Sequence, residues 1–284
     1  MATDGYAIDA SRIFTENPKL HSLRSLLRNK GGIVIGLSAG VDSSLLAKVA
    51  FDELGDKAVA VTAASPSLSS ADRLLASGNA REIGIRHVFV ETSEFENPEY
   101  RKNDAMRCYH CKAELSSALW AFARKEGLPA VALGVNSSDE GDFRPGIRAA
   151  AESGICFPLL ECAIGKQEVR EMAKALGLSA HDRPSNSCLS SRIQYGQVID
   201  AKSLLMVEGA EEVLRDHGFR NVRVRLHGNV ARIEVDSEFL SQLVEEKTRK
   251  EIAERFRSLG FAYVTLDLEG FRTGSMNLSL RNSL

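Results

Sequence analysis

Small and polar residues gather at 36–44, where the chain reads Gly-Leu-Ser-Ala-Gly-Val-Asp-Ser-Ser. An apolar run, 33–35, comes directly before this stretch, and a helix-like run, 45–54, follows it. Small residues let backbone N–H groups approach an anion, and the N-terminus of a following helix adds partial positive charge. We therefore predict that this turn binds phosphate, with Ser38 and Ser43 adding hydroxyl donors. The alternative is an ordinary turn between a strand and a helix.

Five cysteines supply a second kind of chemistry. Cys108 and Cys111 form a C-x-x-C pair, a spacing that suits a metal, an iron–sulfur cluster or a redox dithiol. Cys188 is the candidate third thiol, if the fold brings it near, and three thiolates would leave one iron of a cubane cluster open. The alternative is a structural pair without a metal and a lone buried thiol at Cys188. Cys156 and Cys162 flank an apolar segment and are predicted to be core residues.

Arginines form a third candidate site near the C-terminus. Arg223, Arg225 and Arg232 alternate on a predicted hairpin and therefore share one face, which Arg192 and Arg272 could join. Arginine forks bind phosphate or carboxylate through paired hydrogen bonds. Ion pairing with nearby carboxylates is an equally good interpretation, and the candidates are Glu208, Glu211, Glu212 and Glu234.

The elements that must position these residues alternate between strand and helix in the first part of the chain. Val- and Ile-rich strands are predicted at 33–35, 57–63, 86–90 and 130–135, with helices between them. This order predicts an α/β domain with a parallel sheet covered by helices on both faces. Ligands bind such sheets beyond the carboxyl ends of the strands. The turn at 36–44 and a polar segment at 136–146 both lie there, although the latter could be a solvated loop.

The pattern changes after a turn-rich passage at 181–187. A helix is predicted at 200–217, a hairpin at 222–235 with its turn at Gly228-Asn229, a helix at 237–259 and a strand at 263–268. We therefore expect two domains, 1–183 and 184–284, the second being a smaller α+β unit.

The composition is that of an ordinary globular protein, with 284 residues, 44% hydrophobic and 26% charged. A net charge of −2 provides no basic field for nucleic acid. No export signal and no apolar run of about 18 residues is found. An odd number of cysteines argues against a disulfide framework. We expect a cytoplasmic protein that binds neither membrane nor nucleic acid.

The turn resembles the loop Ser-Gly-Gly-x-Asp-Ser of the ATP pyrophosphatase (PP-loop) superfamily. It reads Ser38-Ala39-Gly40-Val41-Asp42-Ser43, and it lacks the Gly-Lys-Ser/Thr of the common P-loop. Ala39 departs from the family's glycine, and alanine disfavours a positive φ.

Further motifs, spread over residues 15–277 in the same order, make the chain similar to the LarE family. They are Cys108-Tyr-x-Cys111-Lys112, Gly134-Val-Asn136-x-x-Asp139-x-Gly-Asp142-x-Arg144-Pro-Gly, Cys188-Leu-x-Ser191-Arg192-Ile193, Tyr195-Gly196, Val222-Arg-Val-Arg225-x-His-Gly, Ala231-Arg-Ile-Glu234 and Tyr263-Val-Thr-Leu-Asp-Leu-Glu-Gly-Phe271-Arg272-x-Gly274.

This resemblance implies an ATP-dependent sulfur transferase of nickel-pincer nucleotide biosynthesis. Its reaction would adenylylate a carboxylate of pyridinium-3,5-biscarboxylic acid mononucleotide, release pyrophosphate and replace AMP by sulfur. In one form of the family a cysteine matching Cys188 is sacrificed, whereas in a three-cysteine form the thiols carry a 4Fe–4S cluster. Having Cys108, Cys111 and Cys188 together, this chain resembles the three-cysteine form.

The resemblance also assigns roles to residues and an assembly to the protein. ATP and Mg²⁺ would be bound by the nucleotide site, namely Ser38, Gly40, Asp42, Ser43 and Gly134. The substrate phosphate would be bound by Arg192, Arg223, Arg225 and Arg272. Glu211 would bind a metal ion, and the chain would form a homohexamer. A PP-loop tRNA thiolase and a non-catalytic nucleotide- or zinc-binding regulator are the alternatives, and the near-neutral charge counts against the first.

Overall fold

The computed structural model describes residues 17–139, 144–184, 186–272 and 274–277. Residues 140–143 of the predicted polar segment lie outside these ranges. The chain divides into two compact units. The first comprises Met1–Ala64, Ser70–Thr92 and Lys112–Ser185, and the second comprises Ser65–Ser69, Ser93–Cys111 and Asn186–Leu284. Two short segments from the first part of the sequence therefore belong to the C-terminal unit.

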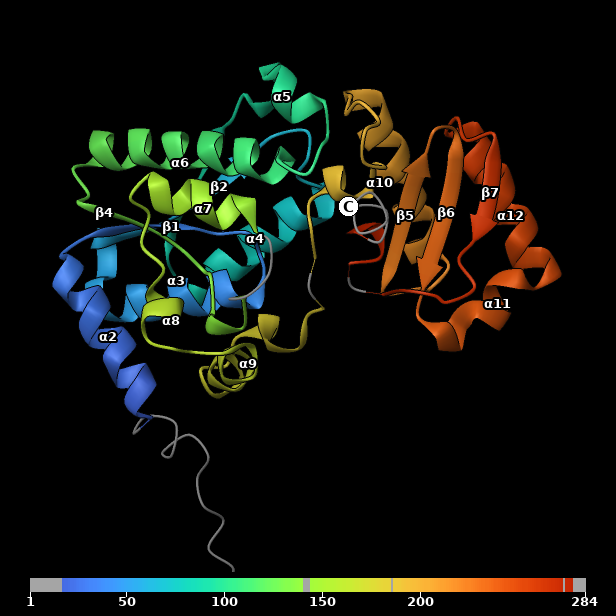
Figure 1. Cartoon of the computed structure of the whole chain (residues 1–284). Coiled ribbons are helices and arrows are strands. Elements are labelled where there is room, and N and C mark those ends of the chain that lie inside the picture. The colour runs from blue at the N-terminus through green and yellow to red at the C-terminus, as the bar shows by residue number, and fades with distance from the viewer. Residues whose placement is uncertain (1–16, 140–143, 185, 273, 278–284) are drawn as a thin grey trace, which may run out of the picture. The chain divides into compact units, whose positions relative to one another are not determined.

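The first unit is built on a parallel sheet in the order β3-β2-β1-β4 (Figure 1). Its strands are β1 (Ile33–Gly36), β2 (Ala58–Ala64), β3 (Arg86–Glu91) and β4 (Ala130–Leu133). Both neighbours pair with β1 in parallel, Ile33 lying opposite Ala58 and Ala130. Every residue of β1 and β4 is buried, as a strand covered on both faces requires. The predicted α/β class is confirmed.

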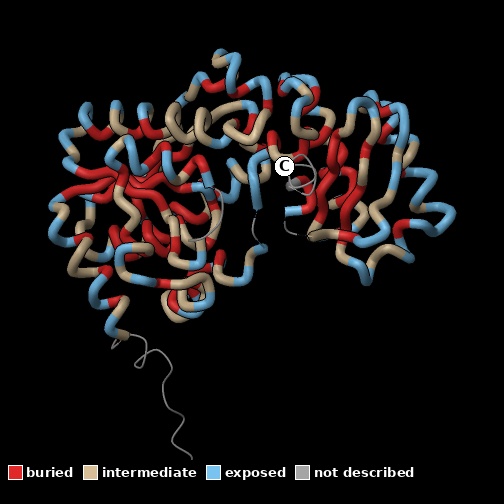
Figure 2. The backbone as a smooth tube through the Cα atoms, in the orientation of Figure 1, coloured by how far each residue is buried: buried red, intermediate tan, exposed pale blue. Residues whose placement is uncertain are grey.

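Alternate residues of the strands pack into two separate cores. Ile33, Ile35 and Ala60 face one cluster, together with residues of α2 (Pro18–Lys30), α3 (Val41–Leu54), α4 (Ser70–Ile83), α8 (Pro158–Glu161) and α9 (Lys166–Ala175). Val34 and Val61 face the other, together with residues of α6 (Arg107–Glu126) and α7 (Pro145–Glu152). This alternation follows from the period of two in a strand. Figure 2 shows the result as buried strands between helices whose outer turns are exposed.

The second unit contains a mixed sheet in the order β5-β6-β7. Its strands are β5 (Val222–His227), β6 (Val230–Val235) and β7 (Tyr263–Leu266), and its short α5 (Pro98–Arg101) comes from an inserted segment. The predicted hairpin is confirmed, with β5 and β6 antiparallel around the turn at 228–229 and β7 parallel to β6. Apolar residues of α10 (Ala201–Asp216) pack with those of the hairpin in a separate core.

One predicted element of this unit is wrong. Instead of a continuous helix over 237–259, the chain forms a short turn, Ser237–Phe239, and then α11 (Leu240–Val244) and α12 (Glu246–Ser258). The break falls at Glu245, whose ψ of 142° is extended rather than helical. Within the described ranges, no helix combines the length and the apolar composition that a membrane span requires.

Candidate active site

The predicted phosphate-binding turn leaves β1, a strand that pairs on both sides, and leads into α3. Gly40 is the N-cap residue of that helix. The turn is closed by the Ser43 hydroxyl, which accepts from the Ser38 N–H at 3.1 Å and donates to the Gly40 carbonyl at 3.1 Å. The N-terminal amides of α3 therefore face the carboxyl end of the sheet, where an anion would be stabilised.

Ala39 stands where the family has glycine, and it adopts a positive φ although alanine disfavours this conformation. Its φ is +63°, a left-handed value that costs a non-glycine residue about 1–2 kcal/mol. Two hydrogen bonds to its carbonyl hold it there, from Asn79 Nδ2 at 3.2 Å and from Arg183 Nη1 at 2.6 Å. Asn79 also donates to Ser44 Oγ at 2.9 Å. Neither Asn79 nor Arg183 was predicted as a site residue, because they lie 40 and 144 positions from Ala39.

Replacing Ala39 by glycine should therefore stabilise the protein. The change removes the strain of a positive φ in the folded state, but it also makes the unfolded chain more flexible, which offsets part of the gain. We expect the free energy of unfolding to rise by about 0.5–1 kcal/mol. Urea denaturation followed by circular dichroism measures this. Ala121→Gly, at an exposed position within α6, is the control and should lower the free energy of unfolding. Equal losses in both variants would contradict the assignment of strain to Ala39.

Asp42, in the first turn of α3, is held by one residue from the segment after β4 and by one from the start of α9. Its Oδ1 accepts from Asn136 Nδ2 at 2.9 Å, and its Oδ2 accepts from Lys166 Nζ at 2.5 Å. The described part of the predicted polar segment thus reaches the turn through Asn136. Lys166, the first residue of α9, was not predicted, because nothing in the local sequence distinguishes it from a surface lysine. An ammonium group here can interact with phosphate oxygens as well as with Asp42.

Gly134 lies against the same helical turn. A Cβ at this position would come within 2.7 Å of the Ser43 nitrogen and 2.8 Å of the Asp42 carbonyl carbon. Both atoms are backbone and cannot move aside cheaply. Gly134 is therefore needed so that the segment after β4 can approach the turn, which gives a physical reason for its predicted place in the site.

All three predicted cysteines lie in the second unit. Cys108 and Cys111 are in the first two turns of α6, and Cys188 comes directly before a short turn, Leu189–Arg192. Cys108 and Cys188 are exposed, and Cys111 is half-buried. Burial raises the pKa of the Tyr100 hydroxyl, and Cys188 and Cys111 raise it further. The tertiary structure thus brings Cys111 and Cys188 close to the same aromatic residue.

The segment that carries the C-x-x-C pair is tied to the segment that carries Cys188. Asn103 is fully buried at a φ of +57°, and its Nδ2 donates to the carbonyls of Ile193, Gln194 and Gln197. Tyr100 contacts Ser190 through their hydroxyl groups at 2.6 Å. In the described part of the chain, no group of three or more His, Cys, Asp or Glu side chains is arranged to hold a metal ion.

The other two cysteines lie in the first unit. Both are half-buried and pack against the first core. Burial, followed by the neighbouring Glu161, raises the pKa of the Cys162 thiol, and Cys156 contacts the Lys30 ammonium at 3.5 Å. Cys156 and Cys162 therefore pack at the edge of the first core rather than at its centre.

Arg192 is fully buried and its guanidinium is surrounded by acceptors. It pairs with Glu211 at 2.8 Å, and it donates to the carbonyls of Ser187 and Cys188 and to the side chain of Asn186. These contacts fix the backbone on both sides of the Cys188 peptide. Its predicted role toward the substrate phosphate stays a prediction, and in this structure Arg192 positions the cysteine loop.

The arginine face of the hairpin is largely buried rather than solvated. Arg223 and Arg225 are only 8% and 6% exposed. Arg225 pairs with Glu234 at 2.9 Å, while Arg223 lies over the ring of Phe271. Burial, followed by the charge of Arg192, lowers the pKa of Arg223 to about 10. So many guanidinium groups close together create an excess of positive charge that an anion would relieve.

Two further arginines at this face bind one carboxylate. Arg232 and Arg272 both pair with Asp267, at 3.1 and 3.3 Å. The predicted phosphate ligand Arg272 is partly exposed, with a side-chain exposure of 32%, so it is the member of the set that a solvent-borne anion reaches most easily.

Glu211 is enclosed by cations and a backbone amide. Its carboxylate accepts from Arg192, from Arg215 at 2.9 Å and from the Val224 N–H at 3.2 Å. Burial alone would raise the pKa of Glu211, but Arg192, Arg223 and Arg215 lower it overall. These contacts use both carboxylate oxygens, and its predicted role as a metal ligand stays a prediction.

Replacing Glu211 by glutamine should destabilise the protein strongly. The change leaves Arg192 buried without its counter-ion, which typically costs about 3–5 kcal/mol. Chemical denaturation at neutral pH measures the loss, and Glu212→Gln, at the exposed neighbouring position on α10, should change little.

The pH dependence of stability tests the same interaction. Because the pKa of Glu211 is lowered in the folded state, its contribution is complete above the ordinary carboxyl pKa and is lost as pH falls through the folded value. The Glu211→Gln variant should lack this part of the acid dependence. If the difference in the free energy of unfolding between wild type and variant stayed the same at all pH values, the assignment would be contradicted.

The fold and the turn together define a class. A parallel α/β sheet with a Ser-x-Gly-x-Asp-Ser turn after a central strand is the fold of PP-loop nucleotide-binding proteins. The chain is 28% identical, over 66% of its length and 74% of the relative's, to a protein named NH(3)-dependent NAD(+) synthetase in Methanococcus aeolicus. This similarity agrees with the PP-loop fold.

Two nearer relatives cover almost the whole chain. An uncharacterized protein of Synechocystis is 46% identical over 91% of this chain and 97% of its own length. The pyridinium-3,5-bisthiocarboxylic acid mononucleotide synthase of Lactiplantibacillus plantarum is 35% identical over 92% of this chain and 95% of its own. No family model matches the chain. The chain belongs to the family of this synthase, LarE, which confirms the resemblance found in the sequence.

Proposed function

We propose that this protein is an ATP-dependent sulfur transferase of nickel-pincer nucleotide synthesis. It would adenylylate a carboxylate of pyridinium-3,5-biscarboxylic acid mononucleotide and convert the activated group into a thiocarboxylate. The observation that carries the proposal is the combination of an anion-binding turn with three cysteines in a chain related over 92% of its length to a pyridinium-3,5-bisthiocarboxylic acid mononucleotide synthase.

The activation half-reaction uses the turn at Ser38–Ser43. A carboxylate oxygen of the substrate attacks the α-phosphorus of ATP, the bond from that phosphorus to the bridging oxygen breaks, and pyrophosphate leaves. The α3 N-terminus and the Lys166 ammonium, which lies 2.5 Å from Asp42, stabilise the charge that develops on the leaving group.

The residues of this turn also suit Mg²⁺. The Asp42 carboxylate and the Ser38 and Ser43 hydroxyls are hard oxygen donors of the kind that this ion prefers. When bound, Mg²⁺ would neutralise phosphate charge. The Lys166 ammonium, which pairs with Asp42 in this structure, can also interact with phosphate oxygens bound at the turn.

The sulfur half-reaction is assigned to Cys108, Cys111 and Cys188. Their sulfurs suit iron in kind, and the buried cation of Arg107 beside two of them suits a negatively charged group, although no finished set of three ligands is present among the described residues. When bound by these cysteines, a 4Fe–4S cluster would supply transferable sulfur in repeated turnovers.

Sacrifice of Cys188 is the alternative source of sulfur. Its thiolate would attack the activated carbonyl carbon and AMP would leave. Loss of the Cys188 α-proton with cleavage of its Cβ–Sγ bond would then give the thiocarboxylate and a dehydroalanine residue. The exposed position of Cys188 is compatible with either route.

The substrate phosphate is assigned to the buried arginine face of the second unit, through Arg223, Arg225 and the more accessible Arg272. The excess of positive charge there supports an anion site. From the family resemblance we further propose that the protein acts in the cytoplasm as a homohexamer.

Anaerobic assays test the proposal. We expect purified or reconstituted protein to contain iron and sulfide, to release AMP and pyrophosphate only with ATP, Mg²⁺ and the pyridinium dicarboxylate together, and to form a thiocarboxylate detectable by mass spectrometry. Iron-free protein that loses the mass of one sulfur after turnover would replace the cluster by the sacrificial route. Absence of AMP under all these conditions would overturn the proposed activity.

A further inference from the structure

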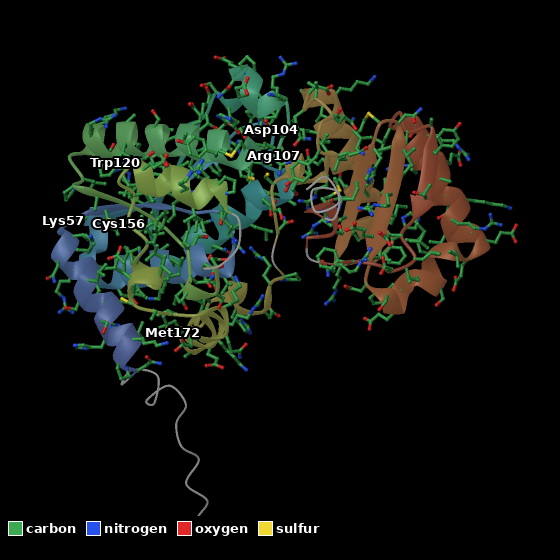
Figure 3. All side chains as sticks on the ribbon, in the orientation of Figure 1. Lys57, Asp104, Arg107, Trp120, Cys156 and Met172 are labelled. Atoms are coloured by element: carbon green, nitrogen blue, oxygen red, sulfur yellow. The ribbon has the colours of Figure 1, made fainter. Side chains whose placement is uncertain are left out.

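Arg107, at the start of α6, carries a buried charge next to the cysteines of the proposed sulfur half-reaction (Figure 3). Arg107 is only 5% exposed. Its Nη1 donates to Asn103 Oδ1 at 2.7 Å and to the Ser190 carbonyl at 3.0 Å, and its guanidinium lies 5.4 Å from the ring centre of Tyr195. The side chain is therefore locked in one position between the two cysteine-bearing segments.

No Asp or Glu among the described residues forms a salt bridge with Arg107, whereas the other buried arginines have at least one carboxylate nearby. A buried charge without an opposite charge is costly. What faces this guanidinium instead is sulfur. Its Nη2 contacts Cys108 Sγ at 3.7 Å, and Cys188 lies within electrostatic range.

We propose that Arg107 is the fixed positive charge of the three-cysteine site, positioning Cys108 and Cys188 and making the space beside their sulfurs favour anionic over neutral partners. The proposal rests on the function assigned to these cysteines above. It follows that a sulfur-bearing anion, or a negatively charged cluster held by thiolates, is stabilised there by a cation already in place before the partner arrives.

Two disulfide reagents of opposite character test this on the iron-free full-length protein. Dithiobis(nitrobenzoate) is a dianion and dithiodipyridine is neutral, and both react with accessible thiols. The measured quantity is the rate with the dianionic reagent divided by the rate with the neutral reagent, determined separately for Cys108 and Cys188. Peptide mass spectrometry shows which cysteine has reacted. Because it is a ratio, it cancels differences in the intrinsic reactivity of a thiol. We expect Arg107→Met to lower the ratio about five- to tenfold, and Arg107→Lys to keep most of it.

Matched controls separate charge from structure. Arg124→Met removes an exposed arginine from the last turn of the same helix and should leave the ratio unchanged. Raising the salt concentration should lower the wild-type ratio and hardly affect the ratio of Arg107→Met. The proposal would be overturned if the wild-type ratio did not change with salt concentration, or if wild type and Arg107→Met had equal ratios. If Arg107→Met fails to fold, the wild-type salt response and Arg107→Lys decide the question.

These measurements need neither ATP nor the pyridinium nucleotide. A protein that released no AMP would overturn the proposed function and would leave the reagent ratios to decide on Arg107. For protein that binds a cluster, Arg107→Met should also lower the cluster's reduction potential, because a positive charge next to it is lost.

Discussion

Replacement of Cys188 by serine is expected to abolish formation of the thiocarboxylate while AMP and pyrophosphate are still released. Serine keeps the shape of the side chain but can neither hold iron tightly nor give up sulfur. The nucleotide turn at Ser38–Ser43 belongs to the first unit, and its closing hydrogen bonds do not involve Cys188. We expect sulfur transfer to fall about a thousandfold or more, as for the loss of a nucleophile.

Parallel measurement of pyrophosphate release and of thiocarboxylate mass tests this separation of the two half-reactions. Cys162→Ser is the matched control, because Cys162 is a half-buried thiol of the first unit whose raised pKa lowers its thiolate fraction. If Cys188→Ser still formed thiocarboxylate at the wild-type rate, neither the cluster route nor the sacrificial route could stand.

Replacement of Lys166 by methionine is expected to lower adenylylation by about 100- to 1000-fold. The ammonium group, now 2.5 Å from Asp42, would be lost as a stabiliser of the charge that develops on pyrophosphate, an effect of the size found for preorganised electrostatic groups. Pyrophosphate release at saturating ATP and substrate measures the rate. Lys166→Arg retains the charge and should recover part of it.

Lys174→Met provides the control, because Lys174 is exposed in the last turn of the same helix, α9. We expect its rate to equal that of wild type. A Lys166→Met protein with normal pyrophosphate release but reduced stability would show that Lys166 only neutralises Asp42, and would remove it from the activation step.

The elements of the first unit could be predicted because their signals are local. The apolar run at 33–35 and the Val- and Ala-rich run at 130–133 are buried on both faces of a parallel sheet, and such strands have no polar alternation to confuse them with surface segments. The hairpin at 222–235 was equally local, with its Gly228-Asn229 turn between two alternating strands. The break at Glu245 was missed because no glycine or proline marks it.

Residue type and short spacing were enough to identify the family and to locate the turn at 36–44 and the three cysteines. How these residues are supported became visible only in the folded chain. Lys166 meets Asp42 across 124 positions and Arg183 meets Ala39 across 144, while Arg107 reaches the Ser190 carbonyl across 83. The hairpin arginines, whose alternation was visible, are buried against Glu234 and near Glu211 rather than solvated. Local patterns encode which backbone forms, whereas the partner of a charged side chain depends on which distant segments the packed cores bring together.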